Sequence, residues 1–151
     1  MAMKLNRQTV PELASRLGEV RSIDQRRWGK LDPPGLMAHL NVALKASLGE
    51  VPVAFVGNPV SRSLPVRWFV LSPLPWPRGR IKAPDSATPP PGLPLDEGRV
   101  QVLSKLDSFF TALETDPTRL AVHPFFGPWS LIVWRRFHEK HFDHHLAQFG
   151  V

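Results

Sequence analysis

The sequence predicts an all-α fold, a four-helix bundle with a long Pro-rich connection between the second and third helices. Four stretches of the chain carry apolar residues at spacings of three and four, as expected of a helix with one buried face. Strand signals are weak throughout, and 11 of the 17 prolines lie between Val51 and Leu95, where they interrupt regular structure. We therefore expect one crossover in place of a tight loop, within a single domain over residues 1–151.

Composition supports a folded domain. The 151 residues suit one domain, which would bury roughly two-thirds of the surface of its unfolded chain. With 42% hydrophobic and 21% charged residues, the chain is not a disordered tail. Cysteine is absent, which excludes disulfides, thiolate metal ligands and a cysteine nucleophile. Any metal ligand must therefore be a nitrogen or an oxygen.

Charge and hydropathy narrow the choice of partners. The first ten residues lack the apolar stretch of a signal peptide, and no run of about 18 apolar residues could span a membrane. We expect a cytoplasmic protein without a membrane partner. A net charge of +6 favours anionic binding partners, such as an anionic small-molecule substrate. The basic clusters at 26–27, 78–82 and 135–136 are short and dispersed, which disfavours nucleic-acid binding.

The first two helices are indicated by capping signals. Thr9 and Glu12 have the spacing of a capping box, and an apolar stripe at helical spacing follows over residues 13–20. The second helix is expected to begin after the N-cap Asp32, with two prolines in its first turn. It is strongly apolar and should end near Gly49.

The Pro-rich connection offers only residues 63–71 as a short helix. Its Trp68, Phe69 and Trp76 indicate packing rather than disorder. A connection of this length within one domain is typical of a functional flap or of an extended wrap over the bundle.

The last two helices follow the connection. The third is expected from Asp96 to about Glu114, because apolar residues recur there at spacings of three and four. Residues 123–128 predict an aromatic turn. The fourth helix should begin after the N-cap Ser130 and run to about Gln148, with Gly150 placed to end it.

Four of the six histidines lie within residues 138–145. At about 100° per residue on a helix, His138, His141 and His145 share an arc of roughly 60° on the face that the bundle would bury. His144 falls at the border of that face and is expected to be solvated. Buried imidazoles need partners, because an unsatisfied polar group in an apolar setting costs about 1–3 kcal/mol.

The spacing of His141 and His145 stacks two imidazoles and suits joint ligation of one metal ion. A third ligand must come from another helix, and His39 is the natural candidate because small alanines beside it leave room. His123 and His138 compete for this role. His138 is better placed to orient a ligand or to transfer protons. For each histidine, a packed imidazole with ordinary hydrogen bonds remains the alternative.

Two segments resemble the DinB-like superfamily, a bundle family named after a DNA-damage-inducible protein. They are Met37-Ala-His39-Leu40 and His141-x-x-x-His145. More narrowly, Trp28-Gly-Lys-Leu31, His123-Pro-Phe-Phe-Gly127 and Lys140–Gly150 are similar to the branch called DUF1569. The resemblance covers both ends of the chain but not the Pro-rich middle.

This resemblance implies an up-down-down-up bundle in which His39, His141 and His145 bind a divalent metal ion, most often zinc or nickel. Several members act as dimers, so a homodimer is expected. Characterised relatives include thiol transferases that use bacillithiol or mycothiol, a mycothiol-dependent isomerase and proposed hydrolases. A low-molecular-weight thiol is therefore a candidate cofactor.

The expected function is that of a metal-dependent enzyme acting on a small molecule. Three neutral histidines leave the ion's charge uncompensated and a coordination position open, as in catalytic sites. Such an ion could supply hydroxide for hydrolysis or hold a thiolate for transfer, with His138 or His123 as the acid/base group. The alternative is a non-catalytic bundle, stabilised by the metal, that binds an acidic partner.

Overall fold

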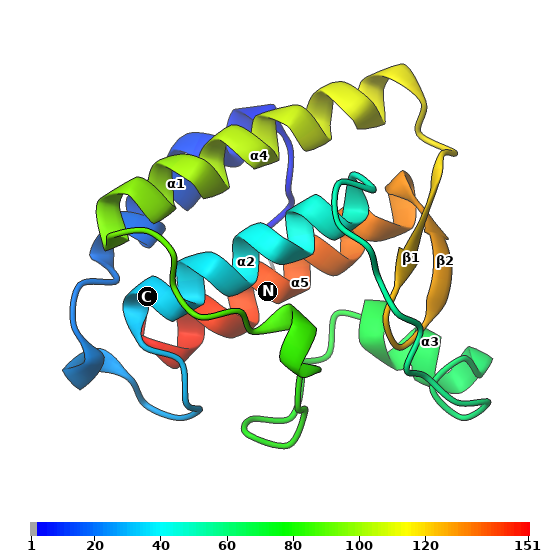
Figure 1. Cartoon of the computed structure of the whole chain (residues 1–151), viewed down its shortest axis with the longest axis horizontal. Coiled ribbons are helices and arrows are strands. Elements are labelled where there is room, and N and C mark those ends of the chain that lie inside the picture. The colour runs from blue at the N-terminus through cyan, green and yellow to red at the C-terminus, as the bar shows by residue number, and fades with distance from the viewer. Residues whose placement is uncertain (1–2) are drawn as a thin grey trace.

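The computed structural model describes residues 3–151, which form five α-helices and one β-hairpin (Figure 1). In chain order these elements are α1 (Val10–Glu19), α2 (Pro33–Ser47), α3 (Leu64–Leu71), α4 (Leu95–Thr115), β1 (Leu120–His123), β2 (Gly127–Ser130) and α5 (Leu131–Gln148). Short 3-10 turns occupy Arg7–Thr9, Ile23–Gln25 and Asp85–Ala87.

Two of the expected helix caps are present, and one is wrong. The Asp32 carboxylate accepts a hydrogen bond from the backbone N–H of Gly35 at 2.7 Å and begins α2. The Ser130 hydroxyl caps α5. Thr9 does not cap α1, because a 3-10 turn precedes that helix and Thr9 already has helical backbone angles. Asn6 caps this turn instead, its side-chain oxygen accepting from two backbone N–H groups.

The prediction of an all-α four-helix bundle is wrong. A fifth helix, α3, forms inside the Pro-rich connection, in the segment where the sequence allowed a short helix. In addition, β1 and β2 pair as an antiparallel hairpin that runs from Leu120 opposite Ser130 to His123 opposite Gly127. Each strand has only four residues, too few for an alternating pattern to stand out. The aromatic turn predicted at 123–128 is the bend of this hairpin, and Gly127 supplies the positive φ of 79°.

The helices α2 and α5 run side by side in opposite directions through the middle of the molecule (Figure 1). Contacts between His39 and His145 near one end, and between Ser47 and His138 near the other, fix this antiparallel pairing. The helices α1 and α4 lie together on one side of the pair.

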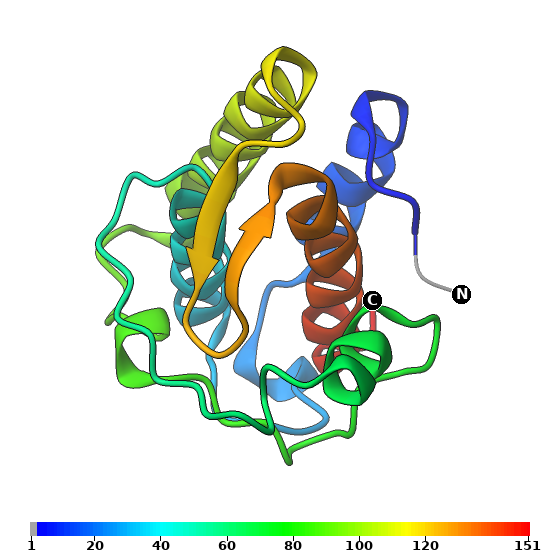
Figure 2. The ribbon, with the colours of Figure 1, turned by 90° about the vertical axis from the view of Figure 1, so that its right-hand side faces the viewer.

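The hairpin contacts both central helices, α2 through β1 and α5 through β2 (Figure 2). Each of these elements contributes apolar side chains to one core. Its largest fully buried members are Trp129, Trp134, Phe109, Phe142, Leu5, Leu13, Leu17, Leu36, Met37, Leu40, Leu44 and Leu106.

The Pro-rich connection wraps around this core. Its first part reaches the hairpin, where the Pro124 carbonyl accepts from the backbone N–H of Val56 at 2.7 Å. Then α3 packs on α5, and the Lys140 ammonium donates to the Leu74 carbonyl at 2.5 Å. None of the helices formed by residues 3–151 combines the length and apolar character that a bilayer crossing requires.

Replacing a core residue of α4 tests this packing. Leu106 is fully buried, so Leu106→Ala should lower the free energy of unfolding by about 2–5 kcal/mol. Val100 lies on the same helix with 67% of its surface exposed, and Val100→Ala should change that energy by less than about 0.5 kcal/mol. Urea denaturation of both variants measures the difference. Equal losses would contradict the orientation of α4.

Candidate metal centre

Three histidines from the two central helices converge on one point. His39 comes from α2, and His141 and His145 come from successive turns of α5. The Nε2 atom of His39 lies 2.9 Å from Nε2 of His141 and 3.0 Å from Nε2 of His145. All three side chains are between 5% and 8% exposed. The structure thus brings together the three residues that the sequence predicted as metal ligands.

Hydrogen bonds on the far side of two rings fix their tautomers. Nδ1 of His39 lies 2.5 Å from the Ala87 carbonyl oxygen, and Nδ1 of His145 lies 2.8 Å from Oε1 of Gln148. Both oxygens can only accept, so each Nδ1 must carry the proton and each Nε2 presents a lone pair. Two lone pairs therefore face each other at 3.0 Å, and a cation between them would turn this repulsion into attraction.

Burial keeps these imidazoles neutral. It lowers the pKa of His39, and it lowers the pKa of His141 and His145 well below the ordinary value of 6.5. The neighbouring imidazoles lower the last two further, because each would repel a second positive charge. Neutral imidazole is the form that binds metal ions, so the donor set fits a divalent cation.

The Pro-rich connection covers this cluster. It supplies the Ala87 carbonyl that holds His39, and it places the Trp76 ring 6.2 Å from that of His141. From within α5, the Phe137 ring stacks against His141 at 5.0 Å. The connection therefore lies against the histidine cluster at two points, Trp76 and Ala87.

Comparison with known protein families found a match. A family described as "Protein of unknown function (DUF1569)" matches residues 14–150. The chain belongs to the DUF1569 family. The match includes the Pro-rich connection, which the sequence motifs alone had left unplaced. Comparisons with curated proteins and with solved structures gave no match.

His144 of this DUF1569 protein is half-buried rather than fully solvated. Its ring lies 5.2 Å from His145, between Trp28 at 6.2 Å and Trp76 at 5.5 Å. Burial lowers its pKa, and repulsion of a protonated His144 by neighbouring groups, including Arg78 and Lys140, lowers it further. Its position three residues after His141 was a usable signal, since such residues are neighbours on a helix. The two tryptophans come from distant segments, so the helical pattern could not reveal them.

Gln148 is a second residue that sequence reasoning missed. It lies three residues after His145, which its side chain orients. Gly29 leaves room for it, because a Cβ atom at Gly29 would lie 2.7 Å from Nε2 of Gln148. The Ala87 carbonyl had no sequence signal, because any residue type carries that group.

His138 lies apart from the three clustered histidines. Its Nε2 lies 3.0 Å from the Ser47 hydroxyl, which donates its own proton to the Leu44 carbonyl and therefore accepts from His138. Nδ1 of His138 is buried with no partner among residues 3–151. The rings of Phe109 and Trp134 enclose the imidazole. Its acid/base role stays a prediction, and the structure gives it a place in the core.

His123 also lies outside the cluster, at the bend of the hairpin. Its Nδ1 accepts the backbone N–H of Phe125 at 3.2 Å, and its ring stacks on Phe126 at 4.5 Å. Burial, with a smaller contribution from His138, lowers its pKa to about 3. Its acid/base role likewise stays a prediction.

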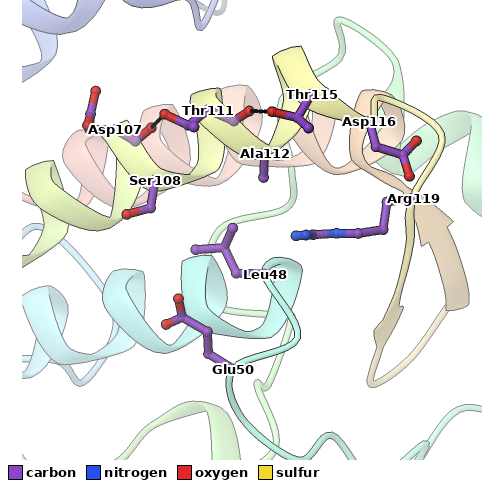
Figure 3. A pocket seen from close by; sticks show the side chains of 9 residues that line it. All are labelled: Leu48, Glu50, Asp107, Ser108, Thr111, Ala112, Thr115, Asp116 and Arg119. Atoms are coloured by element: carbon purple, nitrogen blue, oxygen red, sulfur yellow. Dashed lines mark hydrogen bonds between the residues drawn. The ribbon is translucent and has the colours of Figure 1, made fainter.

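An open groove of about 450 Å³ lies elsewhere, between the end of α2 and the second half of α4 (Figure 3). It is lined by Leu48, Glu50, Asp107, Ser108, Thr111, Ala112, Thr115, Asp116 and Arg119. The hydroxyls of Thr111 and Thr115 are already bonded to carbonyls of their own helix. No histidine lines this groove, so the candidate centre remains the cluster between α2 and α5.

The burial of His138 predicts a dependence of stability on pH. Burial lowers its pKa to about 3 from 6.5. Between these values the unfolded chain binds a proton that the folded chain does not, so the stability from neutral His138 is lost as pH falls. The loss is about 1.4 kcal/mol per pH unit. His138→Phe should therefore shrink the drop in unfolding free energy between pH 7 and pH 5 by up to about 2 kcal/mol.

Urea denaturation of both proteins with a chelator present measures these drops without any contribution from metal. An unchanged drop in His138→Phe would show that His138 is not held neutral in the core.

Proposed function

We propose that this DUF1569 protein binds a divalent metal ion through Nε2 of His39, His141 and His145. One observation carries the proposal, the convergence of three neutral imidazoles, two of which have their Nε2 lone pairs fixed toward each other. The same contacts without an ion would leave a buried repulsion. The predicted ligand set, drawn from sequence and resemblance, is the same three residues.

The donor atoms favour a transition metal. The cluster consists of three imidazole nitrogens. Calcium and magnesium prefer oxygen ligands, whereas imidazole suits zinc and nickel. We therefore propose zinc or nickel as the bound ion.

We further propose a metal-dependent hydrolase or thiol transferase acting on a small molecule. Three protein ligands are typical of catalytic zinc sites, which keep a further position for water or substrate. When bound, the ion supplies Lewis acidity toward a water or a thiol. The chain itself excludes bulk water through Trp76 and Phe137 and orients two of the ligands through Ala87 and Gln148.

The resemblance to the DinB-like superfamily points the same way. Its characterised members include thiol transferases and proposed hydrolases, and membership of this chain in that superfamily is part of the proposal. A low-molecular-weight thiol as cofactor and an anionic substrate agree with the net charge of +6.

A second function is favoured by the depth of the cluster. The three rings are at most 8% exposed and lie beneath the connection, which suits an ion that only stabilises a binding module for an acidic partner. Cobalt substitution separates the two functions. A change in the visible cobalt spectrum on adding 2-mercaptoethanol indicates an open position, and an unchanged spectrum indicates a filled shell.

Metal content tests the ligand set directly. Protein purified without a histidine tag should hold about one equivalent of zinc or nickel, since three ligands from one chain define a single site. His141→Ala and His145→Ala should each lose most of it, and His144→Ala should retain it. Mass spectrometry of the metal measures all four proteins. Wild-type protein that is metal-free and takes up neither zinc nor nickel would refute the proposal, as would equal loss in His144→Ala.

The hydrogen bond between Gln148 and His145 predicts that loss of the Gln148 side chain weakens metal binding without abolishing it. Gln148→Leu removes the oxygen that holds Nδ1–H of His145 and should weaken zinc affinity by about 10–100-fold. Gln101 offers a matched control, because its side-chain oxygen accepts a hydrogen bond from Asn41 and does not contact the histidine cluster. Competition with a zinc-binding dye measures both variants. Equal affinities for Gln148→Leu and Gln101→Leu would remove Gln148 from the proposed centre.

A further inference from the structure

Residues 51–84, the larger part of the Pro-rich connection, carry a strongly basic charge. Residues 51–84 contain five basic residues and neither aspartate nor glutamate. Their charge of +5 compares with +6 for the whole chain. The basic residues in this stretch are Arg62, Arg67, Arg78, Arg80 and Lys82.

The same stretch exposes large apolar side chains around α3. Val60 is 70% exposed, Leu64 is 79% exposed and Trp68 is 67% exposed. Arg62 and Arg67 are exposed among them, and neither guanidinium has an ion-pair partner within residues 3–151. We call these five residues the α3 face.

The opposite side of α3 is held firmly. Val70 is buried, and its carbonyl accepts from Nε1 of Trp76 at 3.0 Å. From α5, Arg136 donates to the Leu71 carbonyl at 3.2 Å and Lys140 donates to the carbonyl of Leu74. A fixed helix thus presents Leu64, Arg67 and Trp68 outward, and Val60 and Arg62 lie in the turn that precedes it.

We propose that the α3 face docks on a lipid bilayer surface that contains anionic headgroups. Arg67, and Arg62 whose guanidinium lies over the Phe55 ring, have no carboxylate partner in the described part of the chain and would pair with lipid phosphates. Tryptophan with leucine and valine would enter the region between headgroups and acyl chains. The contact is peripheral. It differs from the expectation of no membrane partner, which rested on the lack of a spanning segment.

Charge and size favour lipid over other occupants. A second copy of the chain would bring two basic faces together, and like charges repel. Nucleic acid would match the arginines but not the exposed Leu64 and Val60. A stable protein partner needs roughly 20–30 residues on each side, many more than the α3 face provides. An apolar groove of about 540 Å³ lies along α3 between Leu64 and Pro73. It has room for the acyl chains of lipids.

Vesicle co-sedimentation of the full chain tests the proposal. Binding is expected with vesicles of phosphatidylcholine and phosphatidylglycerol, absent with phosphatidylcholine alone, and weaker at high salt. The double variant Leu64→Ser with Trp68→Ser should weaken binding at least about tenfold, because it removes two inserted side chains. Arg62→Glu with Arg67→Glu should abolish it.

A matched control uses apolar residues of similar exposure on other elements, Val100 of α4 and Leu120 of β1. Val100→Ser with Leu120→Ser should bind vesicles like the wild type. Circular dichroism checks that every variant is folded. The proposal is overturned if wild-type protein ignores anionic vesicles, if it binds neutral vesicles equally, or if the control pair weakens binding as much. Binding to polyglutamate without binding to vesicles would assign the face to an acidic protein instead.

Discussion

The antiparallel contact between α2 and α5 is the constraint on which the proposed centre depends. It places His39 opposite two histidines that are one helical turn apart, so that three Nε2 atoms meet. At the other end of the same contact, Ser47 meets His138. A slip of one turn between these helices would separate all of these partners, because one turn moves a side chain by about 5.4 Å.

Around this contact, the rest of the chain decides what the imidazoles can do. The Pro-rich connection covers them, and burial keeps them neutral. Ala87 and Gln148 hold the outer nitrogens of two rings, so that the inner nitrogens are acceptors only. Neutrality, tautomer and convergence are three separate conditions for metal ligation. The connection that looks like an irregular insert therefore contributes two of the three.

The sequence predicted the helices α2, α4 and α5 and the meeting of His39, His141 and His145, because spacing, caps and small neighbours are local signals. It did not predict the hairpin, whose four-residue strands include Gly127 and Pro128 and show no clear alternation. The sequence pattern placed the first helix cap at Thr9. The 3-10 turn that Asn6 caps contains no repeating apolar residues that would have revealed it. The pattern also placed His144 in solvent, whereas this side chain is half-buried beside tryptophans from two remote segments. The errors at Thr9 and in the hairpin concern short elements without a clear apolar period, and the error at His144 lies where distant segments meet.

The central claim is that the Nε2 lone pairs of three histidines, two of them fixed by hydrogen bonds at Nδ1, form one metal site. Nitrogen NMR of the imidazoles tests it most directly. Long-range proton–nitrogen spectra of ¹⁵N-labelled, metal-free protein should show His39 and His145 as Nδ1–H tautomers, and one equivalent of zinc should shift Nε2 of the three ligand histidines together. Other histidine nitrogens should move far less. An Nε2–H tautomer for His39 or His145 in metal-free protein, or zinc shifts that leave these three atoms unchanged, would contradict the account.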